Sequence, residues 1–257
     1  MDDDDGDSIT VTTATPDVSA NRILAALPHR ERETILPHIE QVEIHLGDIL
    51  DQPGEPIKNL YFPLRSAISV TDILDEHHTV EVTLTGAEGC SGASIVQGSD
   101  RSVCMTLVQI GGPAIRLPGA ALMSHLSRLP YLQGALQRYN ALLLRHAVIS
   151  VGCSRFHSHH QRLARWLKAH WDRTGLETFP FTMEFLGAQA GLDRNTVTQV
   201  VDDLQRHGTV MKGHHTITIT DHDGLTKACC ECFALCKQAT GEYLAALQEI
   251  TRANRGG

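Results

Sequence analysis

The stretch FTMEFLGAQAGLDRNTVTQVVDDLQRHG (Phe181–Gly208) carries the strongest local pattern in the chain. Thr182 is suited to cap a first short helix, and Gly191 follows where a tight turn needs a residue that tolerates a positive φ angle. Asp193 is suited to cap a second helix, whose apolar residues recur at the spacing of one helical face: Val197, Val200, Val201 and Leu204. Two short helices joined by a glycine turn predict a helix-turn-helix unit.

The outward face of the second predicted helix is polar, and its side chains suit base recognition. Arginine can bond guanine through two hydrogen bonds, and asparagine or glutamine can bond adenine in the same way. Threonine suits phosphate or thymine-methyl contacts. We therefore predict a DNA-binding surface made by this helix and the hairpin KGHHTITI that follows it, with these residues in contact: Arg194, Asn195, Thr196, Thr198, Gln199 and Lys212. The alternatives are an ordinary helix pair and a plain surface hairpin.

N-terminal to this unit, the sequence pattern from about residue 40 to 118 is typical of short strands. QVEIHL, AISVTDI, TVEVTLT, VCMTLVQI and PAIRL are β-rich runs separated by glycine and proline turns. Regular short strands of this kind predict a small antiparallel barrel or roll. Residues 1–20 are acidic and rich in Thr and Ser, and are predicted to form a flexible tail.

Between the two regions lies a predicted long helix that no proline interrupts from Tyr131 to about Gly152. Its apolar residues are spaced by 4, 3 and 4, which is typical of a seam that faces another helix. We predict that this seam forms a dimer interface: Leu132, Leu136, Tyr139 and Leu143. The alternative is a helix that packs on its own barrel.

The composition is compatible with a cytoplasmic protein. The formal net charge is −8, but five of the acids lie within the first seven residues. Residues 153–214 hold eight Lys and Arg against six Asp and Glu, so the predicted DNA-binding region is mildly basic. The N-terminus does not have the pattern of a secretory signal, and no apolar run is long enough to span a membrane. We therefore expect no membrane partner.

The seven cysteines are odd in number and irregular in spacing, which indicates thiols in a reducing compartment. Four of them lie near the C-terminus: Cys229, Cys230, Cys232 and Cys236. We expect these to be buried structural thiols, with a metal or redox site as the alternative. The run His157, His159 and His160 is expected to be a polar hinge before a helix. No metal ligand is assigned in the sequence.

Taken together, these stretches resemble the Crp/Fnr family of bacterial transcription regulators. The resemblance rests on NLYFP, VEVTLTGAEGCSG, the GSDRS turn, HQRLARWL, the opening stretch and CCECF, which lie within residues 21–235. It implies an α+β fold with an N-terminal cyclic-nucleotide-binding-like β-roll, a long dimerisation helix and a C-terminal winged helix-turn-helix. By the same resemblance, Arg194, Asn195 and Gln199 occupy the base-reading positions.

The resemblance also implies an effector pocket, which we assign to Ser91, Gly92, Arg101 and Ser102. Arg101 and Ser102 match the pair that holds a cyclic phosphate in the family. Ten residues earlier, where the family has a glutamate for the ribose, this chain has Ser91. The missing charge-assisted hydrogen bond, about 1.5–3 kcal/mol, argues against cyclic AMP and leaves another ligand or none. The family's oxygen sensors hold an iron–sulfur cluster with N-terminal cysteines, and the first 89 residues here have none, so no cluster is expected.

The predicted domains are a tail (residues 1–20), a β-roll (21–120), a dimerisation helix (121–153), a winged helix-turn-helix (154–235) and a helical tail (236–257). We expect a non-enzymatic regulator that binds near-palindromic double-stranded DNA as a homodimer, and RNA polymerase as a further partner of an activator. The alternatives are a cupin-like metal enzyme, disfavoured because the roll lacks an HxH pair, and a ligand sensor independent of cyclic nucleotides.

Overall fold

The structure is a computed structural model that describes residues 9–12, 16–75 and 78–253. Most of the predicted acidic tail, residues 1–8 and 13–15, lies outside the described residues. The chain forms two compact units. The first contains residues up to 68, residues 85–140 and residues from 244 onward, and the second contains residues 69–84 and 141–243.

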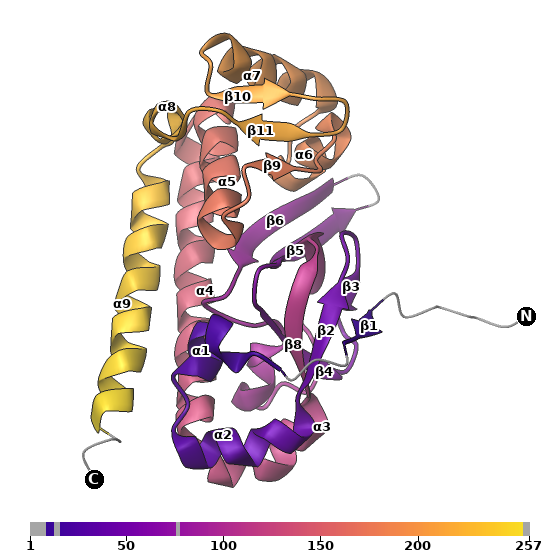
Figure 1. Ribbon diagram of the computed structural model, residues 1–257. Helices are drawn as coiled ribbons and strands as arrows, with labels where there is room; N and C mark the ends of the chain where they lie inside the picture. The colour runs from indigo at the N-terminus through magenta and orange to yellow at the C-terminus, as the bar shows by residue number, and fades with distance from the viewer. Residues whose placement is uncertain (1–8, 13–15, 76–77, 254–257) are drawn as a thin grey trace, which may run out of the picture. The chain divides into compact units, whose positions relative to one another are not determined.

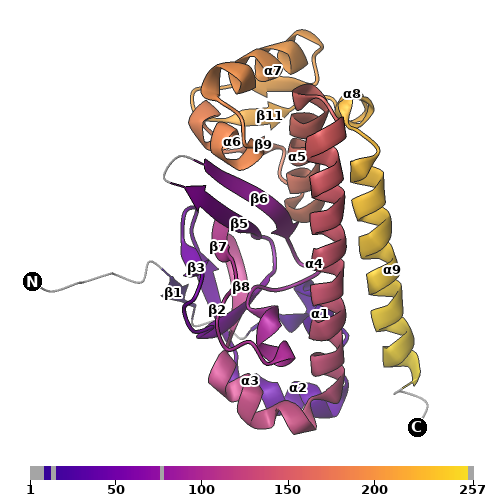
Figure 2. The ribbon, with the colours of Figure 1, turned by 180° about the vertical axis from the view of Figure 1, so that it is seen from behind.

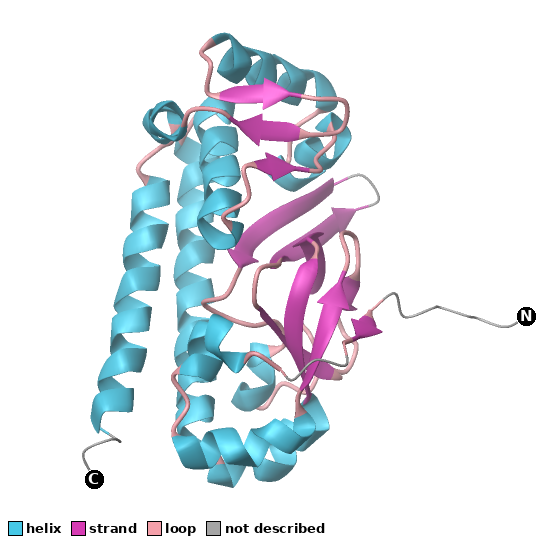
Figure 3. Ribbon diagram, viewed as in Figure 1, coloured by secondary structure: helices cyan, strands magenta, loops and turns pink. Residues whose placement is uncertain are grey.

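The first unit is built on antiparallel strands, as the alternating β-rich runs predict (Figure 3). One sheet has the order β1-β2-β8-β4, and β3 pairs with β7 in a second sheet. In the first sheet Val42 lies opposite Ala114, and Phe62 lies opposite Ile115. The strands of this unit are β1 (Thr10–Val11), β2 (Glu40–Ile44), β3 (Ile49–Asp51), β4 (Asn59–Pro63), β7 (Met105–Ile110) and β8 (Gly112–Pro118).

The core of the first unit lies where alternate residues of these strands face inward. The buried cluster is Val42, Ile44, Tyr61, Ile68, Val108 and Ala114. Side chains that alternate along a strand point to opposite faces. In β2 the alternation separates buried from more exposed residues, whereas in β4 residues on both faces are buried. The structure therefore confirms the predicted antiparallel roll.

Short helices flank the roll: α1 (Arg22–Ala25), α2 (His29–Ile35) and α3 (Gly119–His125). The long helix α4 spans Pro130–Phe156, whereas the sequence predicted it over residues 121–153. Proline is suited to a first helical turn because it has no N–H to leave unpaired. The buried carboxylate of Glu31 accepts hydrogen bonds from the N–H groups of Tyr131 and Leu132, at 2.8 and 2.9 Å, and so completes the start of α4.

The second unit contains the predicted helix-turn-helix and its hairpin (Figure 1). Strands β5 (Ala67–Asp75, from Ser69 onward) and β6 (His78–Thr85) are neighbours in one sheet. The other sheet has the order β10-β11-β9. The remaining elements are α5 (His159–Thr174), β9 (Thr178–Phe179), α6 (Met183–Ala190), α7 (Arg194–Arg206), β10 (Val210–Lys212), β11 (Ile217–Ile219), α8 (His222–Ala228) and α9 (Cys232–Ala253).

An aromatic core lies between α5 and the segment that leads into α6. The His170 ring lies 3.8 Å from the Trp166 ring and 5.4 Å from the Phe181 ring, between centroids. Its Nδ1 lies 2.9 Å from the Trp166 carbonyl oxygen. Burial lowers the pKa of His170 to about 3, because the charged imidazolium would lose its hydration. His170 is therefore a neutral core residue at physiological pH.

Within each unit, the part of α9 that belongs to it contacts α4 (Figures 1 and 2). Within the first unit the Tyr131 hydroxyl donates to the Leu247 carbonyl at 3.0 Å. Within the second unit His146 Nε2 lies 3.3 Å from the Cys236 carbonyl oxygen. Because α9 is continuous from Cys232, the predicted boundary between residues 235 and 236 falls inside a helix.

Among the described residues, none of the helices is both long enough and apolar enough to cross a membrane.

Candidate nucleic-acid interface

Helices α6 and α7 are held together by the turn that the sequence predicted. The Thr182 hydroxyl accepts a hydrogen bond from the Phe185 N–H at 3.1 Å, which caps α6. Gly191 follows the helix with φ +63°, a left-handed conformation that glycine adopts without steric cost. The Leu192 N–H then donates to the Gly187 carbonyl at 2.9 Å. These contacts confirm the predicted helix-turn-helix.

Gly187 lets the backbone of the turn approach α6 closely. A Cβ atom at this position would lie 2.7 Å from the Leu192 carbonyl oxygen, which is too close for van der Waals contact. Any side chain here would therefore push the turn, and with it the start of α7, away from α6. No local pattern in the sequence distinguishes Gly187.

Asp193 caps α7 through one carboxylate. Its Oδ1 accepts from the N–H groups of Asn195 and Thr196, both at 3.0 Å, and its Oδ2 accepts from the Thr196 hydroxyl at 2.6 Å. The Thr196 hydroxyl and then the backbone N–H groups hold the pKa of Asp193 below its usual value. The cap therefore stays ionised at neutral pH, next to the positive end of the helix dipole.

The inward face of α7 anchors the helix in the second unit. Val197, Val201 and Leu204 are fully buried, and Val200 is partly buried. This stripe matches the prediction. Since α7 packs by this face, the residues on the opposite side of its first turns are fixed toward solvent.

Arg194, Asn195 and Gln199 are the exposed residues on that side. The Arg194 Nε lies 2.5 Å from Oε1 of Glu184 in the first turn of α6. Both side chains are well exposed, so this ion pair is worth only about 0–1 kcal/mol. Glu184 thus orients the Arg194 guanidinium, and the weak ion pair can be exchanged for another hydrogen-bond acceptor at little cost in free energy.

Thr196 and Thr198 are only partly exposed, and their hydroxyl groups already have partners in α7. The Thr196 hydroxyl bonds the Asp193 cap, and the Thr198 hydroxyl donates to the Arg194 carbonyl at 2.8 Å. Their oxygen lone pairs and methyl groups remain available. The structure therefore places them beside the three exposed residues, with a smaller polar contribution than we predicted.

Lys212 lies at the end of β10, in the predicted hairpin. The Lys212 ammonium group is 3.0 Å from Oδ1 of Asp202, and the backbone N–H of Lys212 donates to Oε1 of Gln205 at 2.8 Å. Both partners belong to α7, so the hairpin is fastened to the same helix that carries the predicted base-reading residues. His214 and His215 are exposed in the loop beyond Lys212.

The predicted dimer interface lies on the inner face of α4. Leu132, Leu136 and Tyr139 have at most 1% of their surface exposed in the single chain, and Leu143 is partly buried. The Tyr139 hydroxyl bonds the Thr85 hydroxyl at 2.7 Å. Side chains with no free surface cannot meet a second copy without rearrangement. These three residues therefore belong to the protein core, as in the alternative of a helix packed on its own roll.

The four residues assigned to an effector pocket have partners within the roll. Ser91 is buried, and its hydroxyl accepts from the Tyr61 N–H at 3.3 Å, while Gly92 follows it with φ +70°. The exposed Arg101 guanidinium donates to the Gly54 carbonyl at 2.5 Å, and the Ser102 hydroxyl donates to the Cys104 carbonyl at 2.7 Å. The side chains of Arg101 and Ser102, which would bind a cyclic phosphate by the family resemblance, donate hydrogen bonds to backbone carbonyl groups in this structure.

The sequence did not predict the ion pairs that Glu184 forms with Arg194 and that Asp202 forms with Lys212. Each acidic residue lies close in sequence to the helix-turn-helix, but no spacing rule pairs a residue of one helix with a residue of another helix or a hairpin. Only the packing of α6, α7 and β10 brings these charges together.

Residues 161–228 match the family model of the Crp-like helix-turn-helix domain. This segment contains α6, α7 and the hairpin of β10 and β11, so the chain contains a helix-turn-helix domain of the Crp-like type. A search of curated protein sequences finds no match.

Solved structures show a similar fold. A Crp/Fnr-family transcriptional regulator from Eubacterium rectale is 14% identical, with a TM-score of 0.64 over 82% of this chain and 98% of that chain. FixK2 from Bradyrhizobium japonicum is 14% identical, with a TM-score of 0.62 over 75% of this chain and 98% of that chain. CLP from Xanthomonas campestris, described as a c-di-GMP-responsive global regulator, is 15% identical, with a TM-score of 0.58 over 74% and 98%.

The chain therefore contains a Crp-like helix-turn-helix domain, and its fold is similar to that of Crp/Fnr-family transcription regulators.

Proposed function

We propose that α7 reads base edges in the major groove through Arg194, Asn195 and Gln199, and that the chain regulates transcription from a near-palindromic site. The observation that carries the proposal is the division of α7 into a fully buried apolar face and an exposed face with three base-reading side chains. Phosphate contacts would come from Thr196, Thr198 and Lys212, which lie beside them.

An exposed apolar stripe on α4 is suited to pair with a second copy of the chain. Leu144, Val148 and Val151 are 67%, 56% and 69% exposed, and their spacing of 4 and 3 is that of one face of a two-helix seam. Large aliphatic side chains in water are unfavourable, and pairing with the same stripe of a second α4 would remove them from it. A two-fold pair would present two copies of α7 to half-sites about 34 Å apart.

Sedimentation velocity tests this dimer face. We expect the wild type to sediment as a dimer and Val148→Asp to weaken dimerisation by about 30-fold or more, because two carboxylates would face each other in the seam. Val148→Ile keeps an apolar side chain and serves as the control. A Val148→Asp protein that dimerises as tightly as the control would place the interface elsewhere.

Selection of bound sequences from random DNA by the purified protein, at moderate salt, tests the function itself. We expect enrichment of a two-fold symmetric motif with two equal half-sites. Binding of all sequences with one affinity, with and without added cyclic nucleotides, would contradict the proposal. The proposed place of action is the cytoplasm, where DNA and RNA polymerase are accessible to a bacterial regulator.

A further inference from the structure

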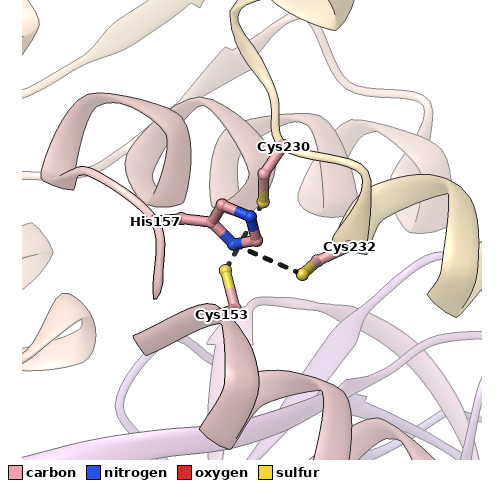
Figure 4. A group of neighbouring side chains, drawn as sticks. All are labelled: Cys153, His157, Cys230 and Cys232. Carbon is pink, nitrogen blue, oxygen red and sulfur yellow. Dashed lines mark hydrogen bonds between the residues drawn. The ribbon is translucent and has the colours of Figure 1, made fainter. Parts of the chain in front are cut away.

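Three cysteines and one histidine from distant parts of the sequence meet in the second unit (Figure 4). Cys153 lies in the last turn of α4, and His157 follows the end of that helix. Cys230 lies between α8 and α9, and Cys232 is the first residue of α9. The three sulfur atoms and one ring nitrogen all lie within 4.8 Å of one another.

Two of the distances within this cluster match the edges of a tetrahedron around one metal ion. The Sγ atoms of Cys153 and Cys230 are 3.5 Å apart, and Cys232 Sγ is 3.6 Å from His157 Nδ1. With zinc–sulfur bonds of about 2.3 Å and zinc–nitrogen bonds of about 2.0–2.1 Å, tetrahedral geometry separates ligand atoms by about 3.5–3.8 Å. An iron–sulfur cluster holds several irons and sulfides between its ligands and needs more space than this.

The histidine has the second contact that metal-bound histidines usually make. While Nδ1 of His157 points into the cluster, Nε2 lies 3.1 Å from Oε1 of Glu231 (Figure 4 shows the ring orientation). A carboxylate on the far nitrogen fixes the tautomer that leaves Nδ1 free to bind a metal, and it increases the basicity of the ring. Glu231 lies between two of the cysteines in sequence, so the same segment that supplies two thiols also supplies this carboxylate.

The charge around the cluster also suits a bound ion. Zinc held by three thiolates and one neutral imidazole carries a net charge of −1. The Arg165 guanidinium interacts electrostatically with Cys153, Cys236, Glu81 and Cys230, and its buried Nε has no hydrogen-bond partner among the described residues. Glu81 supplies one negative charge near this buried cation, and the zinc–thiolate centre would add another.

We propose that Cys153, His157, Cys230 and Cys232 form a structural zinc site. Zinc would displace one proton from each thiol to the solvent and bind the neutral imidazole, with no redox change. Four protein ligands fill the tetrahedron and leave no open position for a substrate or water, which is the pattern of structural rather than catalytic zinc. The ion would fasten the end of α4 to the junction of α8 and α9.

The proposed site differs from two expectations from the sequence and matches the metal site that was left as the alternative for the C-terminal cysteines. His157 is not merely part of a polar hinge, and two of the C-terminal cysteines are not merely buried thiols. The spacings Cys-x3-His at residues 153–157 and Cys-x-Cys at residues 230–232 were visible in the sequence, but 72 residues separate the two pairs.

The test uses the full chain, purified under reducing conditions without chelator. We expect about one zinc ion per chain by elemental analysis. Replacement of zinc by Co²⁺ should give the near-ultraviolet thiolate-to-cobalt band and the intense visible bands of a tetrahedral sulfur-rich site. Cys230→Ser should lose stoichiometric zinc, and Glu231→Gln should weaken zinc binding by about 10–100-fold.

Cys229→Ser is the matched control, because Cys229 is adjacent to Cys230 but lies outside the cluster. It should retain one zinc ion per chain. Equal loss of zinc from Cys229→Ser and Cys230→Ser would overturn the ligand assignment. A wild-type protein that binds neither Zn²⁺ nor Co²⁺, or that forms a Cys153–Cys230 disulfide in place of the site, would overturn the proposal. If Cys230→Ser does not fold, the Co²⁺ spectrum of the wild type decides.

Discussion

Helices α7 and α4 both carry apolar residues at helical spacing. For α7 the sequence predicted that these residues pack in the core of the protein, and they do. For α4 it predicted a dimer interface, whereas the residues are largely buried within the single chain. In α7 the apolar residues form a single stripe, so the face opposite to it is exposed and polar. In α4 two apolar stripes share the helix. One, with Leu136, is buried in the protein, and the other, with Val148, is exposed. Spacing identifies a stripe, but it does not say which neighbour covers it.

The largest expected effect separates the two stripes of α4. Leu136 is fully buried, so Leu136→Ala should lower the free energy of unfolding by about 2–5 kcal/mol through lost burial and a cavity. Leu144→Ala, on the exposed stripe, should change the stability of the monomer by no more than about 0.5 kcal/mol. Urea denaturation at two protein concentrations measures both, since the contribution of dimerisation depends on concentration. Equal losses would remove the distinction between the stripes.

A smaller effect tests how α7 is positioned. Gly187→Ala would bring a methyl group within 2.7 Å of the Leu192 carbonyl oxygen, and we expect a loss of about 1–3 kcal/mol in unfolding free energy. DNA binding should weaken as well, because the start of α7 moves. Gly241→Ala in α9 meets no atom within 4 Å and should stabilise the protein by about 0.5–1 kcal/mol. A neutral result at Gly187 would show that the turn has room to adjust.

The smallest effect concerns pH and the cap of α7. The lowered pKa of Asp193 means that its ionised form stabilises the folded state. This contribution is present above the usual pKa of an aspartate and is lost as the pH falls through the lower pKa of the folded protein. Asp193→Asn retains a capping oxygen without the charge. Thermal unfolding from pH 7 to pH 3 should therefore show a weaker acid dependence in Asp193→Asn than in the wild type. Identical pH profiles would contradict the assigned cause.

The local parts of the molecule could be predicted from the sequence. Thr182, Gly191 and Asp193 specify caps and a turn through groups a few residues away, and alternation specified the strands of the roll. The remaining features depend on contacts between distant segments. Glu31 at the start of α4, Glu184 beside Arg194, and the meeting of Cys153 with Cys230 follow from tertiary packing, for which a single sequence has no periodic signal.

Arg194→Ala tests whether the exposed face of α7 reads DNA sequence. Wild type and variant are compared by selection from the same random DNA at the same salt concentration, with Lys212→Ala as the control for a phosphate contact. We predict that Arg194→Ala loses preference at one base pair of each half-site, by about 1–3 kcal/mol, and keeps the rest of the motif. Lys212→Ala should weaken binding uniformly. A uniform loss with Arg194→Ala as well, and an unchanged motif, would contradict the assignment of α7 as the reading helix.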